Sequence, residues 1–214
     1  MSGPGPVRVA VLDLDGTLVD SFADLAGSVN HALRSVGLPA RPLDEIRGFI
    51  GEGARLLLER AVDPHLHLLE PALAAWWAHY EPHCLDQTAL FAGMERALAG
   101  SGRALAVHTN KPGRLARKIL QGLGVAPRFA AVLGGDEAPR KPDPRGTLEL
   151  LSRLGGLPAE AVFIGDSMID AETARAAGVP FVAVTWGFGA RDALAGARPV
   201  ALVDRVEELA PWLA

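Results

Sequence analysis

The chain has 214 residues, of which 49% are hydrophobic, and its formal net charge at pH 7 is −4. This length suits one large domain, or a core domain with a smaller insertion. The mild negative charge gives no reason to expect nucleic acid or a membrane as a partner, and no apolar run reaches the ~18 residues of a membrane span. Cys84 is the only cysteine, so no intrachain disulfide can form and we expect a cytoplasmic protein.

Five short apolar segments predict the strands of a buried parallel sheet. The first, residues 7–12 with the sequence VRVAVL, runs directly into an acidic turn. This is typical of a buried strand that ends at a functional loop. Four later apolar runs also end in polar or glycine-containing turns. These runs cover residues 104–107, 130–133, 161–164 and 181–184.

Helical patterns lie between the later strands. Residues 112–122 begin with Pro112 at a first helical position and continue with apolar residues at helical spacing. Residues 144–154 and 169–177 have similar patterns. Strands that alternate with helices predict an α/β fold with a Rossmann-like, doubly wound parallel sheet.

The stretch between the first strand and Leu85 breaks this alternation. Apolar residues at helical spacing predict helices near residues 25–36, 46–62 and 73–80, and no convincing strand occurs among them. An all-helical block at this place is best interpreted as an inserted cap domain. The predicted core then consists of residues 1–19 and 85–214, and the predicted helical cap of residues 20–84.

Polar residues follow several of the predicted strands, at the edge where parallel sheets bind ligands. Carboxylates that share one crevice repel each other and raise each other's pKa values, whereas Mg²⁺ takes oxygen ligands and cancels the repulsion. The set therefore predicts a site for a divalent cation. Its members are Asp13 and Asp15, Thr109 and Asn110, Asp166 and Asp170, with Lys141 in a proline-flanked loop.

The spacing of Asp13 and Asp15 indicates how such a site would react. Residues i and i+2 at the end of a strand point the same way, so both carboxylates can face one substrate. One carboxylate can serve as a nucleophile that forms an aspartyl-phosphate, while the second protonates the leaving oxygen and then activates water. Gly16 allows a sharp turn, and its amide can bind phosphate oxygens.

Three further residues would bind the transferring phosphoryl group. Thr109 supplies a hydroxyl donor, Asn110 a backbone amide and Lys141 a positive charge, which together would stabilise the charge on the phosphoryl oxygens. His108 precedes Thr109, and the sequence leaves open whether it contacts substrate.

The sequence resembles the haloacid dehalogenase superfamily of phosphohydrolases and matches its four motifs in order. This resemblance implies that Asp13, the backbone carbonyl of Asp15 and Asp166 ligate Mg²⁺, with Asp170 acting directly or through water. It also implies that the helical insertion closes over the site. The motifs are residues 13–20 (DLDGTLVD), Thr109, Lys141 and residues 165–170 (GDSMID).

Residues 46–61 of the predicted cap (IRGFIGEGARLLLERA), residues 109–112 (TNKP) and residues 134–136 (GGD) resemble the phosphoglycolate phosphatase group of this superfamily. We therefore expect a small phosphorylated metabolite, 2-phosphoglycolate first, as substrate. Pyrophosphate, a nucleotide or a sugar phosphate stay open as alternatives. Arg47, Glu52 and Arg55 lie in the cap loop that would select substrate, and an arginine there would suit a small carboxylate. A solvent-exposed helix start explains these three residues equally well.

Other functions fit the sequence less well. Dehalogenases and phosphonate-cleaving relatives lack the second aspartate of the first motif, which is Asp15 here. Leu25 and Gly51 stand near the places where sugar phosphomutases have a histidine and an arginine. A phospho-acceptor receiver domain has no large helical insertion, and a non-catalytic metabolite-binding relative would be expected to lack a motif residue. The sequence leaves open whether the protein is a monomer or a homodimer.

Overall fold

A six-stranded sheet forms the centre of the structure, a computed structural model that describes residues 7–214. The strand order is β5-β4-β1-β6-β7-β8, and every neighbouring pair is parallel. The sheet is therefore the predicted Rossmann-like, doubly wound one, and the fold class is confirmed. The strands are β1 (Val9–Leu12), β4 (Ala104–His108), β5 (Phe129–Leu133), β6 (Ala161–Gly165), β7 (Phe181–Val184) and β8 (Ala201–Val203).

Alternate residues of β1 face opposite sides of the sheet, because side chains along a strand alternate with a period of two. Val9 and Val11 pack into one apolar cluster with Leu150. Ala10 and Leu12 belong to a second cluster. Both faces are buried, which explains why the strands are continuously apolar in sequence. The core helices are α5 (Met94–Ala99), α6 (Gly113–Gly122), α7 (Arg145–Arg153), α8 (Met168–Ala177), α9 (Arg191–Gly196) and α10 (Ala210–Leu213), with 3₁₀ turns at Ala126–Arg128, Pro158–Glu160 and Val206–Leu209.

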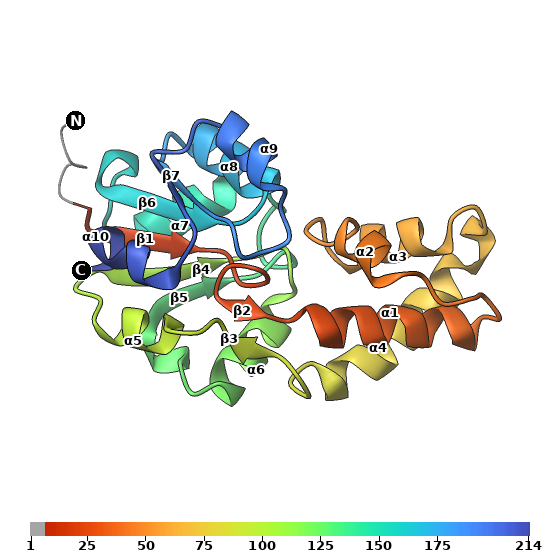
Figure 1. The fold of residues 1–214 in the computed structure, drawn as a ribbon. Helices are drawn as coiled ribbons and strands as arrows, with labels where there is room; N and C mark the ends of the chain where they lie inside the picture. Colours follow the sequence, from red (N-terminus) through yellow and green to blue (C-terminus); the bar gives the residue numbers. More distant parts are fainter. Residues whose placement is uncertain (1–6) are drawn as a thin grey trace.

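Between two short strands, β2 (Val19–Asp20) and β3 (Ala89–Leu90), every element is helical, and we call residues 22–83 the helical segment. It projects to one side of the sheet in Figure 1, and β2 and β3 pair antiparallel where the chain enters and leaves it. The expectation of no strand before Leu85 is wrong at β2, because two residues are too few for a recognisable pattern. Residues 1–6 of the predicted core lie outside the described residues. The segment contains α1 (Phe22–Ser35), α2 (Leu43–Arg47), α3 (Ala54–Val62), a 3₁₀ turn (Leu66–Leu68) and α4 (Leu69–His83).

The predicted single helix near residues 46–62 is two helices in the structure. The chain leaves helical geometry after Arg47 and resumes it at Ala54. Between them Gly51 has a φ of 125° and Gly53 a φ of 94°. These are backbone conformations that glycine adopts without steric cost and other residues do not. The break creates a loop between α2 and α3 that faces the core.

A buried carboxylate joins α1 to the chain returning from α4. Asp24 is 6% exposed and accepts hydrogen bonds from the backbone N–H groups of Gln87 and Thr88 and from the Thr88 hydroxyl, the shortest being 2.7 Å. A buried charge is tolerated when donors satisfy it in this way. Asp24 therefore holds together the two ends of the helical segment beside β2 and β3.

None of the helices within residues 7–214 has the length and apolar character that crossing a membrane requires. The longest, α4, has 15 residues, whereas a membrane-spanning helix needs about 20.

His108 is buried inside the core. It is 1% exposed, and its Nδ1 lies 2.9 Å from the Thr147 hydroxyl of α7. A side chain at Gly146 would place its first carbon 2.4 Å from His108 Nε2, so the imidazole packs directly against α7. Burial, and next the positive charge of Lys141, lower the pKa of His108 from 6.5 to about 3.

Stability will therefore fall in acid as His108 is forced to take up a proton. Between pH 6.5 and about 3 the unfolded chain binds a proton at His108 that the folded chain does not, so its contribution to stability is complete above pH 6.5 and is lost as the pH falls. We expect the free energy of unfolding of His108→Gln to fall less steeply with decreasing pH than that of the wild type, by up to about 1.4 kcal/mol per pH unit. Urea unfolding of both proteins from pH 7 to 4 measures this, with the exposed His67→Gln as control. If the unfolding free energies of wild type and His108→Gln fell equally steeply with pH, the buried neutral His108 would not be the cause.

Candidate active site

The parallel sheet brings three loops to one edge. β1 lies between β4 and β6, and Asp13, Thr109 and Asp166 each directly follow one of these strands. Parallel neighbours end at the same edge, so these three residues lie together there although they are far apart in sequence. This topology explains why the predicted site residues converge.

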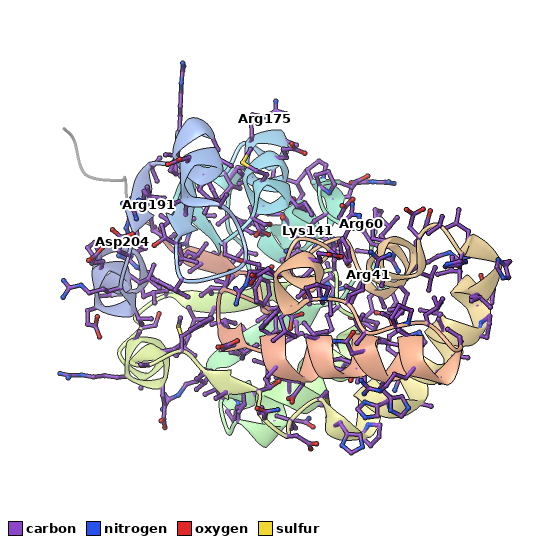
Figure 2. All side chains as sticks on the ribbon, turned by 45° about the vertical axis from the view of Figure 1, so that its right-hand side comes forward. Arg41, Arg60, Lys141, Arg175, Arg191 and Asp204 are labelled. Carbon is purple, nitrogen blue, oxygen red and sulfur yellow. The ribbon has the colours of Figure 1, made fainter. Side chains whose placement is uncertain are left out.

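Three of the predicted metal ligands form one buried acidic cluster. Asp13, Asp166 and Asp170 are 8%, 1% and 0% exposed, and one carboxylate oxygen from each lies within 4.8 Å of the others. Lys141 places its ammonium nitrogen 2.8 Å from Asp13 Oδ1 and 2.6 Å from Asp170 Oδ1. Figure 2 shows Lys141 between the core and the helical segment that carries Arg41 and Arg60.

The cluster holds more negative charge than Lys141 can balance. Burial raises the pKa of Asp13 to about 7 against the opposing positive charge of Lys141. Burial, and next the negative charges of Asp170 and Asp13, raise the pKa of Asp166 to about 8. Asp13 Oδ1 is close to Lys141 but at an angle unsuited to a hydrogen bond, and no other described residue donates one to it. Three carboxylates with one ammonium leave two negative charges, which a divalent cation bound by oxygen ligands would neutralise. The residues therefore fit such a cation.

Asp170 and Asp166 are each held by neighbouring groups. Oδ2 of Asp170 accepts hydrogen bonds from the Ser167 hydroxyl (2.6 Å) and the Ser167 N–H (3.1 Å). The Asp170 N–H donates to the Ser167 hydroxyl oxygen, and the two bonds from backbone N–H groups form a capping box at the start of α8. Asp166 accepts one hydrogen bond from the Thr17 hydroxyl (2.9 Å) and another from the Phe188 N–H (2.7 Å). The sequence analysis did not identify Thr17 or Phe188, although Thr17 lies within its first motif.

Gly16 is required by close packing at this cluster. Its φ is 82°, and a Cβ at this position would lie 2.4 Å from Asp166 Oδ2. Any side chain would therefore collide with the carboxylate in addition to straining the backbone. The glycine allows the turn after Asp13 to lie directly against Asp166.

Asp15 is bound by residues that the sequence analysis did not select. Both of its carboxylate oxygens lie 2.9 Å from Lys111 Nζ, and Oδ1 also accepts 2.6 Å from the Ser21 hydroxyl. Lys111 also donates 2.8 Å to the Tyr80 hydroxyl of α4. Burial favours neutral Lys111, but Asp15 and Tyr80 outweigh this effect and raise the pKa of Lys111 above its ordinary value. In the sequence, only the segment TNKP at residues 109–112 pointed to Lys111, because Lys111 directly follows the predicted site residues Thr109 and Asn110.

Thr109 and Asn110 are buried at the end of β4, 2% and 5% exposed. The Thr109 hydroxyl accepts 3.2 Å from the Lys111 N–H. The Asn110 amide donates to the carbonyls of Gly51 (3.0 Å) and Lys141 (3.1 Å) and accepts 2.8 Å from the Lys141 N–H. Asn110 thus connects the loop of the helical segment to the loop that carries Lys141.

A cavity of about 260 Å³ lies between the sheet edge and the helical segment. Asp13, Asp15 and Thr109 line it from the core, and mainly apolar side chains line it from the helical segment. A concave, largely apolar site with a few convergent polar groups is typical of a small-molecule site. The apolar lining from the segment includes Leu25, Ile50, Leu57 and Trp76.

The three candidate residues of the cap loop do not share one environment. Arg47 lines the cavity, with its guanidinium 4.3 Å from the centre of the Phe22 ring. Arg55 forms an exposed ion pair with Glu70, and Glu52 forms one with Arg60. The structure therefore brings Arg47 to the site and engages Glu52 and Arg55 elsewhere within the helical segment.

Comparisons with known proteins agree with this geometry. The chain is 38% identical over 221 residues to a phosphoglycolate phosphatase of Rhodospirillum rubrum, covering 96% of this chain and 90% of that protein. It is 40% identical over 185 residues to a phosphoglycolate phosphatase of Caulobacter vibrioides, covering 82% and 78%. The crystal structure of a predicted phosphoglycolate phosphatase from Haemophilus somnus superposes with a TM-score of 0.88 at 31% identity, covering 94% of this chain and 96% of that one.

A family model described as haloacid dehalogenase-like hydrolase matches residues 10–184. This range runs from the second residue of β1 to the end of β7 and contains every residue of the acidic cluster. The chain belongs to the haloacid dehalogenase-like hydrolase family.

Proposed function

We propose that this protein is a Mg²⁺-dependent phosphatase that hydrolyses 2-phosphoglycolate through an aspartyl-phosphate on Asp13. The observation that carries the proposal is the placement of two carboxylates, Asp13 and Asp15, in one cavity with Lys141 against the first of them. Relatives named phosphoglycolate phosphatase, 38% and 40% identical to this chain, support the choice of substrate. A pyrophosphatase or a phosphatase for nucleotides or sugar phosphates would use the same core residues.

The reaction has two steps. In the first, an oxygen of Asp13 bonds to phosphorus, the bond from phosphorus to the ester oxygen breaks, and Asp15 gives its proton to that oxygen. In the second, Asp15 takes a proton from water, the water oxygen bonds to phosphorus, and the bond to Asp13 breaks. Phosphate leaves and both carboxyl groups return to their starting states.

Positive groups around Asp13 would balance the charge of the phosphoryl oxygens. Mg²⁺ would be held by Asp13, the backbone carbonyl of Asp15 and Asp166, and would supply charge neutralisation at the phosphoryl group. Asp170 would act directly or through water, and its two oxygens are also bound by Lys141 and Ser167. The Lys141 ammonium, the Thr109 hydroxyl and the backbone N–H of Asn110 would bind the remaining oxygens. The Gly16 N–H, which the sequence also suggested for this role, donates a hydrogen bond of 2.9 Å to the Val19 carbonyl instead.

We further assign residues 20–84 to a cap that closes over the core, which comprises residues 1–19 and 85–214. The helical segment lines one side of the cavity and is hydrogen-bonded to the core through Asn110 and Gly51. Enclosure of this kind excludes water while the aspartyl-phosphate forms. A cytoplasmic location suits the single buried Cys84.

Arg47 is the residue of the helical segment best suited to read the carboxylate of the substrate. It lines the cavity, and the rings of Phe22 and Phe188 lie 4.3 and 5.7 Å from its guanidinium. Among residues 7–214 it forms no ion pair with a carboxylate. Aromatic faces stabilise a guanidinium without neutralising its charge, so Arg47 stays available for an anionic leaving group.

Replacing the nucleophile will abolish turnover. Asp13→Asn keeps the shape of the side chain but removes the attacking carboxylate, and we expect kcat to fall on the order of 10³-fold or more. Phosphate release from a panel of phosphomonoesters with Mg²⁺ measures this, with the distant, exposed Asp192→Asn as control. Full activity of Asp13→Asn would overturn the mechanism. If the wild type prefers another ester and Asp13→Asn no longer hydrolyses it, the mechanism stands and only the proposed substrate is wrong.

Binding of Mg²⁺ will release protons. Because the pKa values of Asp13 and Asp166 are raised to about 7 and about 8, these carboxyl groups carry protons at neutral pH that the cation must displace. Affinity should therefore rise with pH up to about 8 and weaken as the pH falls below 7. Calorimetric titration with Mg²⁺ in two buffers of different ionisation enthalpy counts the protons. Affinity independent of pH between 6 and 8.5 would contradict the assignment of this cluster as the metal site.

Loss of Arg47 will weaken binding of carboxylated substrates selectively. We expect Arg47→Met to raise KM for 2-phosphoglycolate by ~10- to 100-fold, the value of a charged hydrogen bond. The same variant should change KM for 4-nitrophenyl phosphate, which has no carboxylate, by less than about 3-fold. Arg55→Met is the matched control, because Arg55 pairs with Glu70 instead of lining the cavity. Equal effects of Arg47→Met on both esters would remove Arg47 from substrate recognition.

A further inference from the structure

The carboxylate of Asp15 is held in place by a short chain of buried polar groups. Lys111 Nζ lies 2.9 Å from each oxygen of Asp15, so the carboxylate meets the ammonium with both oxygens. The same ammonium donates 2.8 Å to the hydroxyl of Tyr80. Ser21 adds a hydrogen bond of 2.6 Å to one Asp15 oxygen. Asp15 therefore has a defined orientation in the cavity.

Tyr80 has little freedom to move. It is 0% exposed, and its ring stacks on Trp76 with the ring centres 4.6 Å apart. Lys111 lies 4.9 Å from the centre of the Tyr80 ring and is 7% exposed. A lysine side chain has four rotatable bonds, so an ammonium that orients another group must itself be fixed by packing and a second partner. Tyr80 provides both.

The two buried lysines of the site serve different carboxylates. Lys141 contacts Asp13 and Asp170, whereas Lys111 contacts Asp15. Lys141 thus lies at the proposed nucleophile and in the acidic cluster. Lys111 lies beside Asp15, the residue that must face the leaving group, on the side of the cavity formed by α4.

We propose that Lys111, fixed by Tyr80, is a positioning residue that orients Asp15 toward the oxygen of the leaving group. This inference rests on the proposed role of Asp15 as the general acid. It gives α4 a part in the reaction, since the residue that fixes Lys111 belongs to the helical segment and not to the core. Lys111 bonds to no substrate atom in this role, and acts through the direction that it imposes on Asp15.

Esters with different leaving groups test this role. Departure of the alkoxide from 2-phosphoglycolate needs a proton from Asp15, whereas 4-nitrophenoxide is weakly basic and leaves without one. kcat/KM covers the steps up to release of the alcohol, so it isolates the step in which Asp15 acts as acid. A general loss of structure would lower kcat/KM for both esters together.

The experiment compares kcat/KM for these two esters in Lys111→Met, Tyr80→Phe and the control Lys118→Met. Lys118 is an exposed lysine of α6, away from the cavity lining. We expect Lys111→Met to lower kcat/KM for 2-phosphoglycolate by ~10²-fold and for 4-nitrophenyl phosphate by less than ~3-fold. Tyr80→Phe, which removes only a hydroxyl, should show the same selectivity at roughly 3- to 10-fold. Lys118→Met should match wild type for both esters.

Asp15→Asn separates failure of this inference from failure of the proposed function. If Asp15→Asn loses the alkyl ester selectively but Lys111→Met and Tyr80→Phe lower both esters equally or not at all, the positioning role is wrong and the mechanism stands. If Asp15→Asn itself is unselective, the general-acid role of Asp15 is wrong and the inference falls with it. Thermal unfolding checks each variant, and Tyr80→Phe decides the question if Lys111→Met does not fold.

Discussion

Lys141 places one ammonium between the carboxylates of Asp13 and Asp170, at 2.8 and 2.6 Å, while the buried Asp166 lies beside them and pairs with no basic side chain of residues 7–214. The groups that surround these three carboxylates are needed because of this excess of negative charge. Buried carboxylates that repel each other need neighbouring donors, and either protons or a cation to balance their charge. Thr17, Ser167 and the Phe188 N–H provide those donors from three different loops. These donors hold the three carboxylates in the arrangement that the proposed divalent cation would require.

The helical segment is part of this site as much as the core is. Asn110 joins it through Gly51, Lys111 joins it through Tyr80, and Arg47 packs near Phe188 of the core. These contacts link the residues after β4 to the α2–α3 loop and to α4, and the loop after β7 to the end of α2. A substrate in the cavity therefore meets charged groups from the core and apolar side chains from the helical segment. This division suits a family in which a constant reaction is combined with varied leaving groups.

Much of the fold could be predicted because its strands are continuous apolar runs that end in polar turns. The runs at residues 161–164 and 181–184 match β6 and β7 to within one residue. β2 has two residues and β8 three, too few for a period to be visible. The break between α2 and α3 was hidden because Ile46 and Ile50 continue a helical spacing across it. The positive φ at Gly51 and Gly53 depends on how the loop meets the core.

The sequence by itself determined the fold class and the four motifs, because strand periodicity and the DxD spacing are local properties of the chain. It also indicated a metal site, since carboxylates at neighbouring strand ends have few other uses. Only the tertiary structure decided which distant groups meet these residues. Lys111 and Tyr80 are 31 positions apart, and Lys111 and Asp15 are 96 apart. No local pattern predicts such pairs, because they arise where α4 meets the loop after β4, and the position of that loop depends on a strand order set by the whole chain.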